Sequence, residues 1–363
     1  MTPPSYRNVL CIRADNMGDV MMSSPAMRAL KQSFGSRITL LTSPAGSIVT
    51  PYLSCIDDVI VASLPWVKSD GMDGGALLAL AETLRGRSFD AVVIFTVYSQ
   101  SALPAAMLSY MAGIPVRAAY ARENAYDLLT HWVPDTEPYE RIAHQVERDL
   151  GLVKSLGADI EDDRLLLESD ARAALTLSGK LEKLGIGEPF IILHPGVSET
   201  KREYPEQYWM EAGKLLGEEF GMPLLVTGSS TEKALADRIV SGIGTCAVSL
   251  AGTLNLGEFI QLVGRTVCAV SVNTGTIHIA AAMQTPAVVL YARTNPQHTP
   301  WKSPFTLLPY SVPSDLRSKS PVIRHVAERL YMEEVPFPQP VEVSGAVRQL
   351  LALSSDAGYH PGF

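Results

Sequence analysis

The chain has 363 residues, of which 47% are hydrophobic and 19% charged, and its formal net charge is −8. At roughly 150 residues per domain this length predicts two domains. The charge comes without a long basic run, which argues against nucleic acid as a partner. The four cysteines are widely scattered, which indicates neither a disulfide framework nor a zinc site.

The first part of the chain alternates between short apolar runs and helical patterns. Parallel strands in a doubly wound sheet give this alternation. We predict strands at residues 8–12, 38–42, 58–61 and 91–95, and helices at residues 20–34, 75–84 and 142–156. The polar, acidic segment 157–167 suits a linker.

The alternation restarts after this segment. We predict strands at residues 190–193, 223–227, 247–250, 267–272 and 287–290, helices at residues 208–220, 230–240, 256–263 and 276–283, and a last helix near residues 343–353. The expected α/β architecture is two Rossmann-like doubly wound parallel-sheet domains, 1–165 and 166–335, facing a central cleft, with the tail 336–363 packing back on the body. Ligands of open parallel sheets bind at the carboxyl ends of the strands.

The stretch around residues 270–283 runs from an apolar strand through a small polar turn into an alanine-rich helix. Thr274, Gly275 and Thr276 stand at the predicted helix start, where unpaired backbone N–H groups favour an anion such as a phosphate. An ordinary strand-to-helix turn is the alternative interpretation.

Several nucleotide-binding signatures are missing from the sequence. Neither half has the Gly-x-Gly-x-x-Gly dinucleotide fingerprint, and there is no Gly-x-x-x-x-Gly-Lys phosphate loop. A nicotinamide enzyme and a P-loop ATPase are therefore disfavoured. No Asp-x-Asp pair ends a predicted strand, so we expect chemistry without a metal and without a cofactor.

An ordered series of motifs resembles glycosyltransferase family 9, the ADP-heptose:lipopolysaccharide heptosyltransferases and their relatives. The series is Ile12-Arg13-x-Asp15-x-Met17-Gly18-Asp19, His144-x-Val146-x-Arg148-x-Leu150, His194-Pro195-Gly196, Gly228-x-x-x-Glu232, Leu250-Ala251-Gly252 and Asn273-Thr274-Gly275. The resemblance covers about residues 8–301 and implies the GT-B fold, inversion at the anomeric carbon and no metal.

By this resemblance Asp19 is the general base, and the surrounding loop residues bind the acceptor: Arg13, Asp15, Asn16 and Gly18. Inverting transfer needs one carboxylate to accept the proton of the attacking hydroxyl, and it needs N–H groups or cations to hold the leaving diphosphate. A helix-capping role is the alternative for Asp19.

The second half is assigned to the nucleotide-sugar donor. By resemblance Glu232 meets the ribose, and the diphosphate or sugar is held by Thr274, Gly275, Thr276 and His278. The donor-binding set also includes Ser198, Thr200, Lys201, Arg202 and Asn273. Three members have a structural alternative: His278 as a core histidine, and Lys201 and Arg202 as a solvated basic pair.

The chain departs from the family pattern at two of these positions. Relatives usually carry a lysine three residues before Pro205, where this chain has Arg202, and commonly an Asp where this chain has Asn273. Arginine would neutralise a diphosphate as a fork. Because position 273 lies close to the sugar and phosphates, the change to Asn bears on which sugar is transferred.

The expected protein is an inverting glycosyltransferase. It transfers a sugar from a nucleotide-sugar donor, ADP-heptose by resemblance, to a bacterial envelope glycan or glycolipid. Alternatives are a nucleotide-sugar 2-epimerase of the same fold and a non-catalytic binding paralogue. No apolar run reaches the roughly 20 residues of a membrane span. We expect a cytoplasmic monomer that can contact the inner membrane peripherally.

Overall fold

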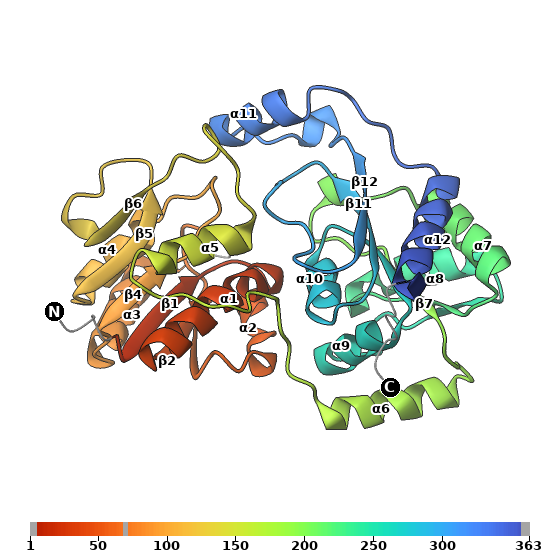
Figure 1. Ribbon diagram of the computed structural model, residues 1–363, viewed down its shortest axis with the longest axis horizontal. Coiled ribbons are helices and arrows are strands. Elements are labelled where there is room, and N and C mark those ends of the chain that lie inside the picture. Colours follow the sequence, from red (N-terminus) through yellow and green to blue (C-terminus); the bar gives the residue numbers. More distant parts are fainter. Residues whose placement is uncertain (1–5, 68–71, 357–363) are drawn as a thin grey trace. The chain divides into compact units, whose positions relative to one another are not determined.

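A computed structural model describes residues 6–67 and 72–356, and the chain divides into two compact units, residues 1–166 and 167–363 (Figure 1). In the described part each unit holds one six-stranded sheet. Every pair of neighbouring strands is parallel. The predicted class, two doubly wound α/β units, is thereby confirmed.

The sheet of the first unit has the strand order β3-β2-β1-β4-β5-β6. Its strands are β1 (Asn8–Arg13), β2 (Arg37–Thr42), β3 (Asp58–Val61), β4 (Ala91–Ile94), β5 (Val116–Ala121) and β6 (His131–Pro134). Since β2 and β4 flank β1, the chain reverses its winding direction between β1 and β4. That reversal is the topological switch point, where open parallel sheets bind ligands.

The helices of the first unit cover both faces of this sheet. They are α1 (Met17–Phe34), α2 (Pro44–Ser47), α3 (Gly74–Gly86), α4 (Leu103–Met111) and α5 (Gln145–Lys154), with short 3-10 turns at Thr50–Tyr52 and Tyr126–Leu128. Helices α1 and α5 pack together, as do α3 and α4 (Figure 1). Leu10 and Ile12 of β1 belong to the apolar core with residues of α3 and α4. Because side chains alternate along a strand, Arg13 points to the opposite face from Ile12.

The sheet of the second unit has the order β12-β11-β10-β7-β8-β9, with its switch point between β7 and β10. Its strands are β7 (Ile191–His194), β8 (Leu224–Val226), β9 (Ala247–Ser249), β10 (Cys268–Val272), β11 (Ala287–Ala292) and β12 (Phe305–Tyr310). Strand β10 is completely buried, in agreement with a sequence that is apolar except for Ser271.

Helices flank the second sheet as well. They are α6 (Ala171–Lys183), α7 (Glu206–Phe220), α8 (Lys233–Ile243), α9 (Leu256–Arg265), α10 (Gly275–Ala282), α11 (Pro321–Leu330) and α12 (Pro340–Asp356), with 3-10 turns η3 (Thr200–Arg202), η4 (Ser230–Glu232) and η5 (Ser314–Leu316). The last helix, α12, packs against α7 and β11 within this unit. In the described ranges, no helix has the length and apolar character needed to cross a bilayer.

Segment 157–167 differs from the linker that its composition suggested. It has no helix or strand, but Ala158 and Leu165 are buried. Arg28 of α1 donates hydrogen bonds to the carbonyl oxygens of Asp162 (2.8 Å) and Arg164 (2.7 Å). Most of the segment is therefore part of the first unit, docked on α1 by backbone contacts that polar composition cannot reveal.

Candidate active site

The loop between β1 and α1 brings three charged side chains into contact. Arg13, the last residue of β1, is completely buried, and its Nη2 donates a 2.8 Å hydrogen bond to Asp19 Oδ1. Its Nε lies 3.4 Å from Asp15 Oδ2. The side chains of Asp15 and Asp19 keep 17% and 14% of their surface exposed. The two carboxylates are thus partly accessible, whereas Arg13 is completely buried and pairs with both; its expected contact with the acceptor stays a prediction.

Asp19 also fulfils the capping alternative. It is the third residue of α1, and its Oδ2 accepts a 3.2 Å hydrogen bond from the backbone N–H of Asn16. Each carboxylate oxygen therefore has one fixed donor, so the side chain is oriented from two sides. Asn16 itself is exposed and Gly18 is buried. A residue that caps a helix with part of its surface free can still accept a proton, so the two roles do not exclude each other.

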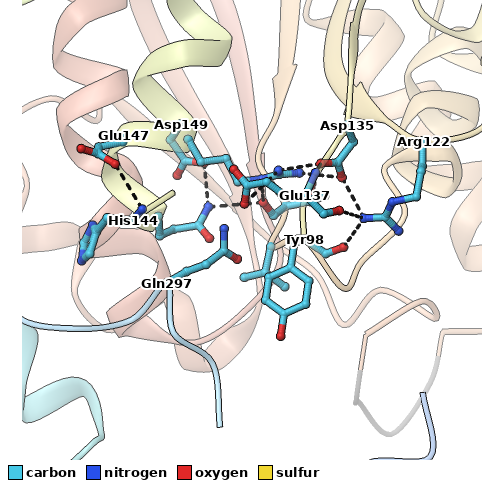
Figure 2. Close-up of polar contacts among 12 residues, drawn as sticks. Tyr98, Arg122, Asp135, Glu137, His144, Glu147, Asp149 and Gln297 are labelled. Atoms are coloured by element: carbon cyan, nitrogen blue, oxygen red, sulfur yellow. Dashed lines mark hydrogen bonds and ion pairs between the residues drawn. The ribbon is translucent and has the colours of Figure 1, made fainter. Parts of the chain in front are cut away.

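A buried polar network lies behind this loop, on the α1 and α5 side (Figure 2). Asp149 of α5 is 1% exposed and accepts hydrogen bonds from Ser23 Oγ (2.6 Å) and Gln145 Nε2 (2.8 Å). Ser23 Oγ also lies 3.1 Å from the carbonyl oxygen of Asp19. Burial raises the pKa of Asp149 to about 6, although the charge of Arg13 opposes that rise. Asp149 thereby joins α5 to the first turn of α1.

The second part of this network centres on Arg148 of α5. Its guanidinium donates to both oxygens of Asp135, at 2.9 and 3.0 Å, and its Nε donates to the carbonyl oxygen of Thr96 at 2.9 Å. Arg122 Nη2 also donates to Asp135 Oδ2, at 3.2 Å, and Figure 2 shows these two side chains meeting. These contacts hold the loop after β4, where Thr96 lies, against the helix that carries Arg148.

A cavity of about 250 Å³ opens at the switch point of the first sheet. It lies at the carboxyl ends of β1 and β4, beside the loop that carries Asp19. Its lining comprises Ile12, Ala14, Asp15, Trp66, Val67, Ile94, Phe95, Thr96, Ser99, Gln100, Ser101, Pro104 and Ala105. Gln100 Nε2 donates a 2.7 Å hydrogen bond to Asp15 Oδ1, which fixes this carboxylate at the cavity wall.

In the second unit, the structure brings the predicted cations next to the predicted phosphate loop. Arg202 Nη1 donates a 3.1 Å hydrogen bond to the carbonyl oxygen of Asn273. Both cations also pair with Glu199, Lys201 at 3.1 Å and Arg202 at 2.9 Å. Ser198 and Thr200 are exposed on the same turn. Arg202 therefore reaches the β10–α10 loop, whereas Lys201 pairs with Glu199.

The side chain of Asn273 serves the fold. It is 6% exposed, and its Nδ2 donates to the carbonyl oxygen of Ala292 and to Thr294 Oγ1, both at 3.1 Å. Its Oδ1 accepts a 3.2 Å hydrogen bond from the N–H of Ala292. An Asp could not donate to the Ala292 carbonyl. Asn273 thus ties the end of β10 to the end of β11, and its expected contact with the donor stays a prediction.

Glu232 lies among glycines that leave room for its carboxylate. A Cβ on Gly196 would come within 2.3 Å of Glu232 Oε1, and one on Gly228 within 3.2 Å of Glu232 Oε2. Its Oε2 accepts hydrogen bonds from the N–H (2.6 Å) and Oγ (2.8 Å) of Ser229. The motifs after β7 and β8 therefore meet at this side chain. Nearby, burial lowers the pKa of His194 to about 4, with Glu232 opposing.

Helix α10 begins at Gly275, with Thr274 as its N-cap residue. Thr274 and Gly275 are half-buried, whereas Thr276 and His278 are 2% and 4% exposed. The His278 ring meets the His298 ring edge to face, with 6.4 Å between centroids. The start of α10 follows Asn273, whose carbonyl oxygen accepts a hydrogen bond from Arg202. A cation and a helix N-terminus therefore lie close together here.

Sequence reasoning missed several residues that belong to these arrangements. Asp149 in the first unit, and Thr294 and His298 in the second, carry no motif of their own. The sequence shows an acidic residue, Asp149, next to Arg148. Its hydrogen-bond partner Ser23 is 126 residues away, so the sequence does not reveal this contact. Within the described ranges, no group of three or more His, Cys, Asp or Glu side chains could hold a metal ion.

Two parallel sheets of this topology, each with polar loops at the strand ends, are also the fold of solved family 9 glycosyltransferases, which have TM-scores of 0.78 and 0.71 with this chain. The family model "Glycosyltransferase family 9 (heptosyltransferase)" matches residues 77–316, and the chain belongs to this family. It is accordingly a glycosyltransferase. The resemblance inferred from the ordered motifs is confirmed.

Individual relatives agree with this assignment. Lipopolysaccharide heptosyltransferase 2 of Escherichia coli K12 is 26% identical over 309 residues, which cover 80% of this chain and 84% of the relative. A family 9 glycosyl transferase from Veillonella parvula has a TM-score of 0.78 at 17% identity, covering 97% of this chain and 99% of its own. A heptosyltransferase from E. coli, solved with ADP, has a TM-score of 0.64 at 20% identity, covering 96% and 98%.

Proposed function

We propose that this glycosyltransferase moves heptose from ADP-heptose to a hydroxyl of a bacterial envelope glycan, such as the lipopolysaccharide core, with inversion and without a metal ion. The observation that carries the proposal is Asp19, an accessible carboxylate held by Arg13 on one oxygen and by the Asn16 N–H on the other. The acceptor would reach the enzyme at the cytoplasmic face of the inner membrane.

In the proposed reaction, the acceptor oxygen attacks the anomeric carbon as the bond from that carbon to the β-phosphate oxygen breaks. The hydroxyl proton goes to Asp19, and ADP leaves with the bonding electron pair. General bases of this kind contribute about 10²–10⁴-fold to a rate. A side chain fixed on both oxygens is already oriented for that transfer, so no rotamer has to be frozen during the reaction.

We assign the stabilisation of the negative charge on the leaving diphosphate to the start of α10 and to Arg202. Backbone N–H groups at a helix N-terminus stabilise an anion, and a guanidinium adds a bidentate cation. The hydrogen bond from Arg202 to the Asn273 carbonyl oxygen supports this, because it draws the cation to the loop from which the helix starts. These groups provide electrostatic stabilisation, so the proposed chemistry needs no divalent ion.

Glu232 is proposed to bind the ribose of the donor. It sits against Gly196 and Gly228, where the missing Cβ atoms leave room for its carboxylate at the ends of β7 and β8. Its Oε2 accepts hydrogen bonds from Ser229, and its Oε1 is the second carboxylate oxygen at this sheet edge. A carboxylate oxygen at this edge of a parallel sheet can accept a hydrogen bond from a ribose hydroxyl.

Thermal shift with ADP, UDP and GDP tests the donor. A ligand at 100 times its dissociation constant adds about 2.7 kcal/mol to stability, so the preferred nucleotide should raise the Tm measurably and the others less. Stabilisation by UDP equal to that by ADP would remove the ADP-heptose donor while leaving the family assignment intact. The anomeric configuration of the product, read by NMR coupling constants, tests inversion separately.

A further inference from the structure

A buried carboxylate lies behind the loop that carries the proposed base. Asp149 of α5 is 1% exposed, and α5 packs against α1, which carries Asp19 in its first turn (Figure 2). In the proposed reaction Asp19 accepts the proton, whereas Asp149 touches no reactant. Burying a carboxylate is costly, so the fold has to compensate it with specific contacts. The contacts of Asp149 lead back to Asp19 along two routes.

The first route runs through Ser23. Its Oγ lies 2.6 Å from Asp149 Oδ2 and 3.1 Å from the carbonyl oxygen of Asp19. A serine hydroxyl has one hydrogen, so it donates to one of these acceptors at a time. When Asp149 is ionised, the hydroxyl donates to its carboxylate. When Asp149 holds a proton, the carboxyl donates to Ser23 Oγ and the hydroxyl donates to the Asp19 carbonyl oxygen. The geometry therefore accommodates both protonation states, and the hydrogen bond to Asp19 differs between them.

The second route runs through Arg13, whose charge both carboxylates share. Its Nη2 donates to Asp19 Oδ1 at 2.8 Å, whereas its Nη1 is buried without a hydrogen-bond partner among the described residues. The charge of Arg13 opposes the rise in pKa that burial causes at Asp149, so the two groups interact electrostatically. An ionised Asp149 adds a negative charge to this group. A like charge nearby makes a carboxylate a stronger proton acceptor, and here that carboxylate is Asp19.

The other titratable or charged groups that interact with Asp149 come from three elements: Cys11 of β1, Tyr120 of β5 and Arg148 of its own helix. Burial raises the pKa of the thiol and of the phenol, so both are neutral near pH 7. The guanidinium keeps its charge and donates to both oxygens of Asp135. Among these groups and Arg13, Asp149 is therefore the one that changes its charge around neutral pH.

We propose that Asp149 is a positioning residue for the transfer reaction: its ionisation makes Asp19 a stronger proton acceptor through Arg13 and Ser23, so turnover rises with pH as Asp149 loses its proton. The inference rests on the proposed role of Asp19 as the base. Burial raises the pKa of Asp149 to about 6, so the rise should be centred near that pH. Since general-base catalysis follows Brønsted behaviour, a stronger acceptor should increase turnover by about three- to tenfold.

The pH dependence of turnover tests this inference. ADP release is measured with ADP-heptose and heptose-deficient lipopolysaccharide between about pH 5 and pH 8.5, on both sides of the expected inflection. Asp149→Asn cannot ionise, so its turnover should equal that of the wild type at the acid end, lack the rise, and lie about three- to tenfold below it at the alkaline end. The Michaelis constant for the donor should not change. A purely structural role would lower turnover at every pH, and a rise that persists in Asp149→Asn overturns the inference.

Ser23→Ala provides the second variant, because it should move the rise and not abolish it. The hydroxyl stabilises ionised Asp149, so its removal should shift the inflection upward by about one pH unit. Melting curves over the same pH range verify that both variants are folded; if Asp149→Asn does not fold, the Ser23→Ala profile decides. An inflection that stays in place shows that another group titrates and overturns the inference alone. Wild-type protein that releases no ADP at any pH counts against the proposed function, and the inference fails with it.

Discussion

Replacing Asp19 with Asn tests the reaction and the local fold together, because the two oxygens of this carboxylate have different partners. Oδ1 accepts from the buried Arg13 guanidinium at 2.8 Å, and Oδ2 accepts from the Asn16 N–H at 3.2 Å. An Asn side chain has one acceptor oxygen, so one of these donors must face an NH₂ group. Losing the charge-assisted bond costs about 1.5–3 kcal/mol of unfolding free energy. At about 2–4 °C per kcal/mol, the Tm should fall by about 3–12 °C.

The catalytic loss should exceed this structural one. Removing a general base lowers turnover by about 10²–10⁴-fold, which corresponds to about 3–5 kcal/mol of barrier. The Michaelis constant for the donor should change little, because the proposed donor contacts lie in the other unit. Initial rates are measured well below the reduced Tm, with ADP release as the readout. A folded variant that keeps more than about a tenth of wild-type turnover would refute Asp19 as the base.

A matched control separates loss of a cap from loss of a base. Asp170 is the N-cap residue of α6, and its Oδ1 accepts hydrogen bonds from the N–H groups of Arg172 (2.9 Å) and Ala173 (3.0 Å). Asp170→Ala should cost about 1 kcal/mol of stability. Its turnover should remain at the wild-type level. If that variant loses activity in proportion to Asp19→Asn, the effect follows general destabilisation and the catalytic argument fails.

Three further outcomes are expected. Turnover should survive EDTA, because N–H groups and Arg202 are proposed to meet the diphosphate charge; a strict requirement for added magnesium or manganese in a rate assay would contradict this. Arg202→Ala should weaken ADP binding more than Lys201→Ala, by about 1.5–3 kcal/mol in calorimetry, since Arg202 alone of the pair contacts the β10–α10 loop; the reverse order would exchange their roles. The pKa of Asp149 is raised to about 6, against about 3.9 in the unfolded chain. The stability that the protonated side chain contributes is therefore fully present below about pH 3.9 and is lost as the pH rises through about 6. Asp149→Asn should therefore destabilise less at about pH 7.5 than at about pH 4.5, and an equal change in Tm at both pH values would count against the raised pKa.

The sequence predicted most strands well because a buried parallel strand leaves a continuous apolar run. The runs in β1 and β10 are of this kind, and their predicted and observed bounds agree within two residues. Strands β5, β6 and β12 were missed. Their sequences mix alanine, arginine or proline into the run, and β6 and β12 are outer strands of their sheets, where burial is incomplete. Whether such segments form strands depends on pairing with neighbouring strands, and the local sequence pattern does not reveal that pairing.

The sequence predicted which residue types stand at the strand ends of the candidate site. It did not predict their burial or their contacts. The motif ending in Asp19 was found, but the complete burial of Arg13 depends on which face of β1 it occupies and on α5 covering that face. Similarly, no sequence pattern shows that the side-chain amide of Asn273 donates hydrogen bonds to Ala292 and Thr294. Contacts between residues distant in the chain determine whether a polar side chain meets a ligand or supports the fold.

The two departures from the family pattern fall in one place in the structure. Arg202, where relatives usually have a lysine, donates a hydrogen bond to the carbonyl oxygen of Asn273, where relatives commonly have Asp. An Asp at 273 would put a carboxylate beside this guanidinium, whereas the neutral amide leaves it with Glu199 as its acidic partner. The amide donors are in turn matched by acceptors on β11 and its following loop. The two residues are adjacent and hydrogen-bonded, but Arg202 Nε is buried without a hydrogen-bond partner among the described residues. Turnover of a nucleotide sugar therefore has to decide between a donor site with altered contacts and a non-catalytic paralogue, because only the former releases nucleotide.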